Sequence, residues 1–157
     1  MTFDDLLSEV KRIASGKDET EAKLLALTAL LHDNAPHYDW VGFYFVNPER
    51  ADELVLGPYT GEPTEHTHIP FGRGICGRVA LTQETLVIQD VAAERNYLSC
   101  SPFVKSEIVL PIFVDGKFAG ELDIDSHAHA PFTDADEEFL GEVCRIVAYL
   151  FKLHTFD

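Results

Sequence analysis

Residues 106–126 read SEIVLPIFVDGKFAGELDIDS, in which two apolar and β-branched segments flank the pair Asp115-Gly116. An Asp-Gly pair between such segments is a strong signal for a β-hairpin, because both residues tolerate the positive φ angles of a tight turn. We predict strands at residues 106–114 and 117–125. Their apolar character is typical of strands near the centre of a sheet.

Acidic side chains alternate with apolar ones along the second of these strands, at Glu121, Asp123 and Asp125. Successive side chains of a strand point to opposite faces, so the three carboxylates share one face. One interpretation is a solvated face, which antiparallel sheets commonly have. The alternative is a covered face, in which the mutually repelling acids need a cation such as the ammonium group of a substrate.

The turn of this hairpin decides on which face Glu107 lies. A two-residue turn at Asp115-Gly116 pairs Glu107 with Ile124, on the face opposite to the acids. A three-residue turn, with Gly116 as a left-handed bulge residue, pairs Glu107 with Asp123 instead. We favour the second arrangement, which adds Glu107 to the acidic face.

Helical periodicity lies at both ends of the chain, with strand-like segments between them. Thr2 and Thr133 each begin a capping-box pattern that opens an amphipathic helix. We also expect a helix at residues 20–32, a short helix at 76–81, a long polar loop at 89–105, and strands at 40–46, 53–56, 66–69 and 85–88. Only short crossovers join these elements. This order predicts one α+β domain over residues 1–157, with a mostly antiparallel sheet and helices packed on one face.

The composition excludes several classes of function. The chain has 157 residues, 46% of them hydrophobic, and a formal net charge of −15, which disfavours binding to nucleic acids and anionic membranes. No apolar run approaches the ~20 residues of a membrane span. The N-terminal segment lacks the basic region of a secretory signal, so we expect a cytoplasmic protein whose thiols stay reduced.

The three cysteines occupy different surroundings. Cys144 lies on the apolar stripe of the last helix, where a structural core thiol is the better interpretation. Cys76 follows a glycine turn in PFGRGICG, and Cys100 lies in the long polar loop. Either these two are ordinary small loop residues or they carry thiol chemistry, because a cytoplasmic protein has little use for a disulfide scaffold.

The turn Gly72 to Gly77 matches the dinucleotide-binding pattern G-x-G-x-x-G only literally, because no βαβ unit surrounds it. We interpret it as a tight turn whose backbone N–H groups, those of Gly74 and Ile75, approach a ligand carboxylate. The two histidine pairs, His66/His68 and His127/His129, lack the usual spacing of a structural zinc site with the cysteines. We therefore expect no metal.

Several segments together resemble one known family: YDWVGFYF, ELVLGPYTGEP, IPFGRGICG, SEIVLPIFVDGKFAGELDIDS and FTDADEEFL. From about Tyr38 to Leu140 the chain is similar to the free methionine-(R)-sulfoxide reductases, which are single GAF domains. This resemblance implies a six-stranded antiparallel sheet with helices on one face and an enclosed ligand pocket on the other. It also implies reduction of free methionine-(R)-sulfoxide to methionine, electrons from thioredoxin rather than from a bound cofactor, and a homodimer.

The resemblance further implies roles for individual residues. The family's nucleophilic cysteine falls on Cys100 and its neighbouring redox cysteine on Cys76, and a sulfenic acid on the first would condense with the second into a disulfide. The remaining positions are a pocket wall at Trp40 and substrate-contacting acids at Glu107, Asp123 and Asp125, of which Glu107 or Asp125 would hold the proton for the sulfoxide oxygen. A third cysteine that is common in the family is replaced here by His66.

Two other functions stay open at the level of sequence. GAF domains commonly bind ligands without transforming them, so a non-catalytic sensor of a small metabolite is the main alternative. A redox or zinc-binding regulator is the weaker one. Consumption of the ligand separates an enzyme from a sensor.

Overall fold

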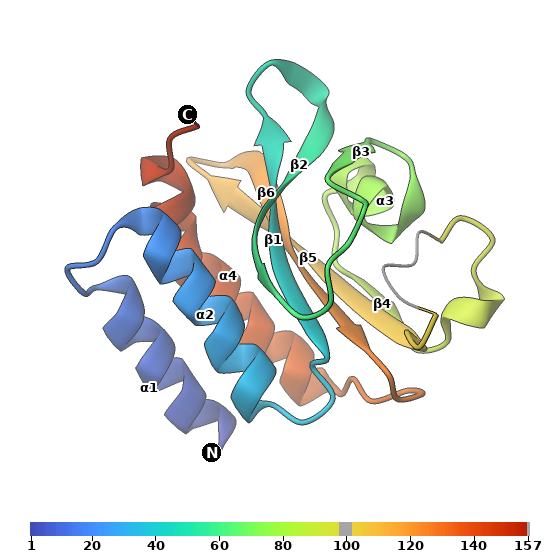
Figure 1. Ribbon diagram of the computed structural model, residues 1–157, viewed down its shortest axis with the longest axis horizontal. Helices are drawn as coiled ribbons and strands as arrows, with labels where there is room; N and C mark the ends of the chain where they lie inside the picture. The colour runs from blue at the N-terminus through green and yellow to red at the C-terminus, as the bar shows by residue number, and fades with distance from the viewer. Residues whose placement is uncertain (98–101, 157) are drawn as a thin grey trace.

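The computed structural model describes residues 1–97 and 102–156 and contains a six-stranded antiparallel sheet in the order β3-β2-β1-β6-β5-β4. The predicted α+β class is confirmed, and the hairpin β5–β6 lies inside the sheet (Figure 1). The strands are β1 (Trp40–Asn47), β2 (Arg50–Thr60), β3 (His68–Pro70), β4 (Leu86–Ile88), β5 (Ser106–Val114) and β6 (Lys117–Ser126).

Helices lie on both sides of this sheet. Three of them pack on one face, namely α1 (Phe3–Ala14), α2 (Thr20–Asn34) and α4 (Asp134–Leu153), and α3 (Gly74–Thr82) lies on the other side (Figure 1). A short 3₁₀ turn, η1 (Val91–Ala93), follows β4. The prediction that helices pack on one face therefore holds for the three long helices, whereas α3 helps to enclose the opposite face. Among the described residues, no helix combines the length and apolarity needed to cross a bilayer.

The two predicted capping boxes begin α1 and α4. In each, the threonine side chain accepts a hydrogen bond from the backbone of Asp5 or Asp136, and that acid accepts one in return from the threonine backbone. Tyr38 donates a further hydrogen bond of 2.5 Å to Asp136, which ties the start of α4 to the residues just before β1. The cap thus also fixes the long helix against the sheet.

The two faces of the sheet bury different kinds of side chain. On the helix side, alternate residues in the middle of β1 and β6 are apolar and fully buried, as at Val41, Phe43, Leu122 and Ile124. The intervening positions of the same strands carry polar or aromatic groups. A second and smaller apolar cluster forms on this other side, where α3 packs against β5 and β6.

The register of the hairpin differs from the prediction. Asp115 and Gly116 have φ angles of 52° and 80° and form a two-residue turn, in which Val114 pairs with Lys117. The extra residue lies further on, where the pairing shifts between Ile112 and Phe113, and this bulge pairs Glu107 with Asp125. The predicted partner, Asp123, is wrong by two positions. The predicted face of Glu107 is confirmed, because one extra residue anywhere in the hairpin shifts the pairing by one and puts Glu107 on the same face as Asp123 and Asp125.

We expect the bulge to depend on Gly120. A Cβ atom at this position would lie 2.1 Å from the carbonyl oxygen of Tyr44, so Gly120→Ala should lower the free energy of unfolding in urea by about 3 kcal/mol. Gly116→Ala is the matched control, because Gly116 has φ +80° but no atom within 4 Å of the added Cβ. It should cost only about 1 kcal/mol. Equal losses in the two variants would contradict this explanation.

Candidate active site

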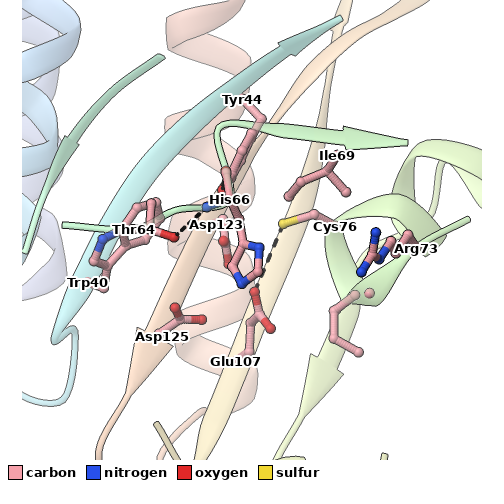
Figure 2. Close-up of a pocket in the computed structure, with 12 residues that line it drawn as sticks. Trp40, Tyr44, Thr64, His66, Ile69, Arg73, Cys76, Glu107, Asp123 and Asp125 are labelled. Atoms are coloured by element: carbon pink, nitrogen blue, oxygen red, sulfur yellow. Dashed lines mark hydrogen bonds between the residues drawn. The ribbon is translucent and has the colours of Figure 1, made fainter. Parts of the chain in front are cut away.

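A small closed cavity lies on the face of the sheet opposite to the three long helices. Its volume is about 20 Å³, roughly the room for a single water molecule. Strands β1, β5 and β6 form its floor, and α3 with the segment between β2 and β3 covers it (Figure 2). The lining residues are Trp40, Tyr44, Thr64, His66, Ile69, Arg73, Gly74, Ile75, Cys76, Glu107, Asp123 and Asp125.

The predicted acids converge on this cavity. Glu107 from β5 and Asp123 and Asp125 from β6 are 4%, 5% and 4% exposed, so the interpretation as a solvated face is wrong. The acidic face is covered because α3 and the β2–β3 segment pack over it (Figure 2). Glu121, the first acid of the alternation, is 0% exposed and does not line the cavity.

Burial changes the protonation of these acids. Loss of solvent raises the pKa of Glu107 well above its usual value, and the neighbouring Asp123 and Asp125 raise it further. Burial likewise raises the pKa of Glu121 well above normal. The pKa of Asp123 is also raised by burial, although hydrogen bonds from Glu107 and Cys76 favour its ionised form. The cluster therefore keeps protons at a pH where exposed carboxyls have lost theirs.

Cys76 lies in the first turn of α3 with its thiol over the acids. Its Sγ donates to Glu107 Oε2 at 4.0 Å (Figure 2). A helix N-terminus usually lowers the pKa of a thiol. Here burial, followed by the charges of Asp123, Glu121 and Glu107, raises the pKa of Cys76 well above normal. The resting group is therefore a thiol.

Cys144 provides the contrast. It is buried in the main core beneath the helices, as expected for a structural thiol. Burial raises its pKa to about 12, and no carboxyl contributes to that rise. Cys100, the predicted nucleophile, lies outside the described residues. Tyr97, a little before it in the chain, packs against the apolar cluster that contains Cys76.

The glycine turn is held by a residue that the sequence did not point to. Asn96 accepts a hydrogen bond of 2.8 Å from the Gly74 backbone N–H and donates one of 2.9 Å to the Gly72 carbonyl. In this structure a side chain therefore already uses the Gly74 amide, although Gly74 itself lines the cavity, and the contact of this amide with a ligand stays a prediction. The amides of Ile75 and Cys76 lie in the first turn of α3, where a helix provides no intrahelical acceptors.

Aromatic side chains of β1 form the wall of the cavity. Trp40 is 3% exposed, stacks on Tyr59 at 5.3 Å between ring centroids, and donates from Nε1 to the Glu62 carbonyl at 3.0 Å. Its ring lies across Gly42, where an added Cβ would come within 2.3 Å of it. The predicted wall residue is thus in place. Tyr44, four residues further along and on the same face, donates from its hydroxyl to the His66 carbonyl at 2.9 Å.

The sequence missed several lining residues. Tyr44 had a usable signal, because it shares the strand face of Trp40. Thr64 had none, since it comes from a segment rich in proline and glycine whose path depends on tertiary contacts. Ile69 lies in the predicted strand at 66–69, but a short strand of this kind does not show which residues its side chains meet. His66, which replaces the family's third cysteine, lies in the cavity wall.

The alternative of a zinc site finds no support in the histidine pairs. Within residues 1–97 and 102–156, the ligating atoms that gather in a group of three belong to Cys76, Glu107 and Asp123, which lie within 4.8 Å of one another. Burial raises the pKa of each of these groups. Bound protons compete with a metal ion, because a carboxyl or thiol group must lose its proton before it can act as a metal ligand.

The fold and its enclosed polar pocket define a GAF domain, and the GAF domain family model matches residues 21–150. The free methionine-R-sulfoxide reductase of Escherichia coli is 35% identical over 96% of this chain and 87% of its own length. The X-ray structure of the same enzyme from Neisseria meningitidis in complex with its substrate is 37% identical, with a TM-score of 0.88 over 96% of this chain and 88% of that one. The chain belongs to the free methionine-R-sulfoxide reductase family.

The buried acids predict an unusual dependence of stability on pH. In the unfolded chain Glu121 ionises near pH 4.5, whereas in the folded protein its raised pKa keeps the proton. Its contribution to stability is therefore complete below about pH 4.5 and is lost as the pH rises, by up to ~1.4 kcal/mol per pH unit until the folded pKa is reached. Glu121→Gln removes this loss. Its advantage over the wild type in urea unfolding should grow from pH 5 to pH 8.

The exposed Glu84→Gln is the matched control, and its difference from the wild type should stay constant over the same range. An advantage of Glu121→Gln that does not change with pH would show that the Glu121 carboxyl titrates normally in the folded protein.

Proposed function

We propose that this protein reduces free methionine-(R)-sulfoxide to methionine by thiol chemistry. The observation that carries the proposal is the convergence of Cys76 with Glu107, Asp123 and Asp125 in one closed cavity. The names of the relatives support it, since the E. coli protein is a free methionine-R-sulfoxide reductase and the Neisseria structure contains its substrate. An amino acid with one sulfoxide group matches this set of partners in charge.

Recognition of a free amino acid follows from the two ends of the cavity. The acids on β5 and β6 attract the substrate ammonium, which also relieves their mutual repulsion. At the other end, the Arg73 side chain and the first-turn amides of Ile75 and Cys76 suit the substrate carboxylate. Trp40 packs along the side chain between them. A methionine sulfoxide inside a polypeptide lacks both terminal charges and is excluded.

The chemistry begins at Cys100, the assigned nucleophile. Its sulfur attacks the sulfoxide sulfur, and the departing oxygen needs a proton. We assign Glu107 as the donor, because burial and two neighbouring acids keep it protonated. The sulfoxide S–O bond and the Cys100 S–H bond break, and the oxygen, carrying the proton from Glu107, forms an S–O bond to Cys100 as a sulfenic acid. The proton of the Cys100 thiol returns to Glu107, and methionine leaves. The sulfoxide is reduced by two electrons and the thiol is oxidised by two.

The second half of the cycle regenerates the thiol. Cys76 attacks the sulfenic acid, a disulfide between Cys76 and Cys100 forms, and the oxygen leaves as water with the thiol proton. Glu107, the hydrogen-bond acceptor of the Cys76 thiol, is the group that first accepts that proton. Thioredoxin then reduces the disulfide by thiol exchange in the cytoplasm. We further propose that the protein is a homodimer and uses two cysteines, with His66 at the position of the family's third.

A sensory GAF domain is the second candidate. The small cavity favours a sensor, because a pocket that admits and releases molecules slowly suits tight binding better than turnover. A sensor binds its ligand and leaves it chemically unchanged, whereas the proposed enzyme consumes it. The following experiment separates the two.

Purified protein with thioredoxin, thioredoxin reductase and NADPH is offered the free R epimer and the free S epimer separately. The R epimer should be converted to methionine and the S epimer should remain, as measured by chromatography of the amino acids. An N-acetylated, C-amidated sulfoxide is the matched control and should remain as well. Binding of the R epimer without conversion would favour the sensor.

Two cysteine variants should fail at different steps. Cys100→Ser should lose at least a thousandfold in kcat/KM, because it lacks the nucleophile. Cys76→Ser should still form one equivalent of methionine per protein and then stop with a sulfenic acid on Cys100, which dimedone traps and mass spectrometry locates. Full turnover of Cys100→Ser would show that another residue attacks the sulfoxide.

A further inference from the structure

The start of α3 is capped by a side chain from a distant part of the chain. The helix's own N-cap residue, Arg73, makes no side-chain capping hydrogen bond. Asn96 instead accepts a hydrogen bond of 2.8 Å from the Gly74 backbone N–H and donates one of 2.9 Å to the Gly72 carbonyl. A carboxamide carries an acceptor and a donor in one plane, so a single side chain serves both backbone groups.

The turn that Asn96 bridges benefits from support outside itself. Gly72 and Gly74 have φ angles of 94° and 65°, which glycine adopts freely, and two glycines so close together leave many other conformations accessible. Cys76 follows Gly74 by two residues, so the direction of its thiol depends on this turn. The side chain of Asn96 therefore helps to set the position of the Cys76 sulfur.

Further contacts hold the loop around Asn96 to α3. Arg78 on the helix donates a hydrogen bond of 2.6 Å to Glu94, and Tyr97 packs against the smaller apolar cluster, which α3 helps to form. The base of the loop is closed by a hydrogen bond of 2.9 Å from the Val91 N–H to the carbonyl at the start of β5's leading segment, residue 105. The loop is therefore held at its base and again at α3.

Cys100, the assigned nucleophile, follows Asn96 by four residues in the sequence. Four residues of chain span at most about 14 Å, so the point at which Asn96 is fixed limits how far Cys100 can lie from the glycine turn. One carboxamide is thus linked along the chain to both cysteines of the proposed cycle. Cys76 lies two residues beyond one of its hydrogen-bond partners, and Cys100 lies four residues beyond Asn96 itself.

We propose that Asn96 is a positioning residue for the disulfide step, in which it fixes the turn before Cys76 relative to the chain before Cys100. The role rests on the proposed function, in which the Cys76 thiol condenses with the sulfenic acid of Cys100. The Cys76 S–H bond and the sulfenic S–O bond break, the S–S bond forms, and water leaves. Asn96 exchanges no proton. Its two hydrogen bonds order both segments beforehand, so less conformational freedom is lost when the sulfurs meet.

Gln89, at the start of the same loop, offers a matched control. Its carboxamide also bridges two backbone groups, because it donates a hydrogen bond of 2.7 Å to the Phe132 carbonyl and accepts one of 3.3 Å from the Phe132 N–H. This pair joins the loop to the residues just before α4, whereas Asn96 joins it to α3. Gln89→Ala and Asn96→Ala each remove a doubly bonded carboxamide from one loop, but the second also loosens the glycine turn.

The first measurement follows the disulfide itself and needs no substrate. Each protein is equilibrated with reduced and oxidised glutathione at a series of ratios, quenched with acid, alkylated, and analysed for the Cys76–Cys100 bridge by peptide mass spectrometry. Asn96→Ala should lower the equilibrium constant for the bridge about fivefold, the effect of two partly solvated hydrogen bonds. Gln89→Ala should stay within about twofold of the wild type, because its contacts are distant from the turn.

Three results would overturn the proposal. The first is an unchanged equilibrium constant in Asn96→Ala, and the second is an equal fall in Asn96→Ala and Gln89→Ala, which indicates general loosening of the loop. The third is a wild type that forms no bridge at any ratio. If Asn96→Ala does not fold, Asn96→Asp replaces it, since Asp keeps the acceptor for the Gly74 N–H and lacks the donor. Its equilibrium constant should then fall about twofold.

A second measurement separates this role from the function itself. Each protein receives one equivalent of free methionine-(R)-sulfoxide, and the sulfenic acid on Cys100 is trapped with dimedone. Asn96→Ala should accumulate about fivefold more trapped Cys100 than the wild type, because condensation is slower, and Gln89→Ala should not. If even the wild type forms neither methionine nor sulfenic acid, the proposed function fails while the glutathione equilibrium still decides the role of Asn96. Equal trapping in active wild type and Asn96→Ala would overturn the role alone.

Discussion

The burial of carboxyl groups on one face of β6 is the constraint on which the rest of the site depends. Three acids of this strand and one of β5 lie under α3 with at most 5% exposure. Carboxyl groups that lie so close together away from water are tolerated only if most of them are protonated or paired with a cation. The site therefore holds protons at a pH where exposed carboxyls have lost theirs, and the substrate ammonium proposed above would relieve the repulsion that this burial creates.

The scaffold separates this strained region from the part of the molecule that stabilises the fold. The alternation of β1 and β6 sends Val41, Phe43, Leu122 and Ile124 into the core under the three long helices. The opposite positions of the same two strands carry the cavity residues. Neighbouring residues of these strands therefore point either into the apolar core or toward the acids. The free energy gained by packing in the core offsets the repulsion among the acids on the other face.

Local patterns in the sequence predicted much of this arrangement. The position of the hairpin at Asp115-Gly116, the capping boxes at Thr2 and Thr133, and the alternation of acids depend on near neighbours, and the structure confirms them. The favoured three-residue turn is wrong, because Val114 pairs with Lys117 and leaves a turn of two residues. The predicted partner of Glu107 was wrong because the position of the bulge depends on a third strand. The bulge lies next to Gly120, which packs closely against the Tyr44 carbonyl on β1. Asn96 and Thr64 reach the site through the path of irregular segments, and no periodicity encodes such a path.

Two hydrogen bonds hold the cover of the cavity to the rigid strand below it. Trp40 bonds to the Glu62 carbonyl and Tyr44 to the His66 carbonyl, so the wall and the cover are tied together at both ends. A space of about 20 Å³ is far smaller than an amino acid, so the residues around it must move apart before one can bind. In the proposed enzyme, the free energy of that opening would reduce the apparent affinity for the substrate. Substrate entry and product departure would then share the same conformational step.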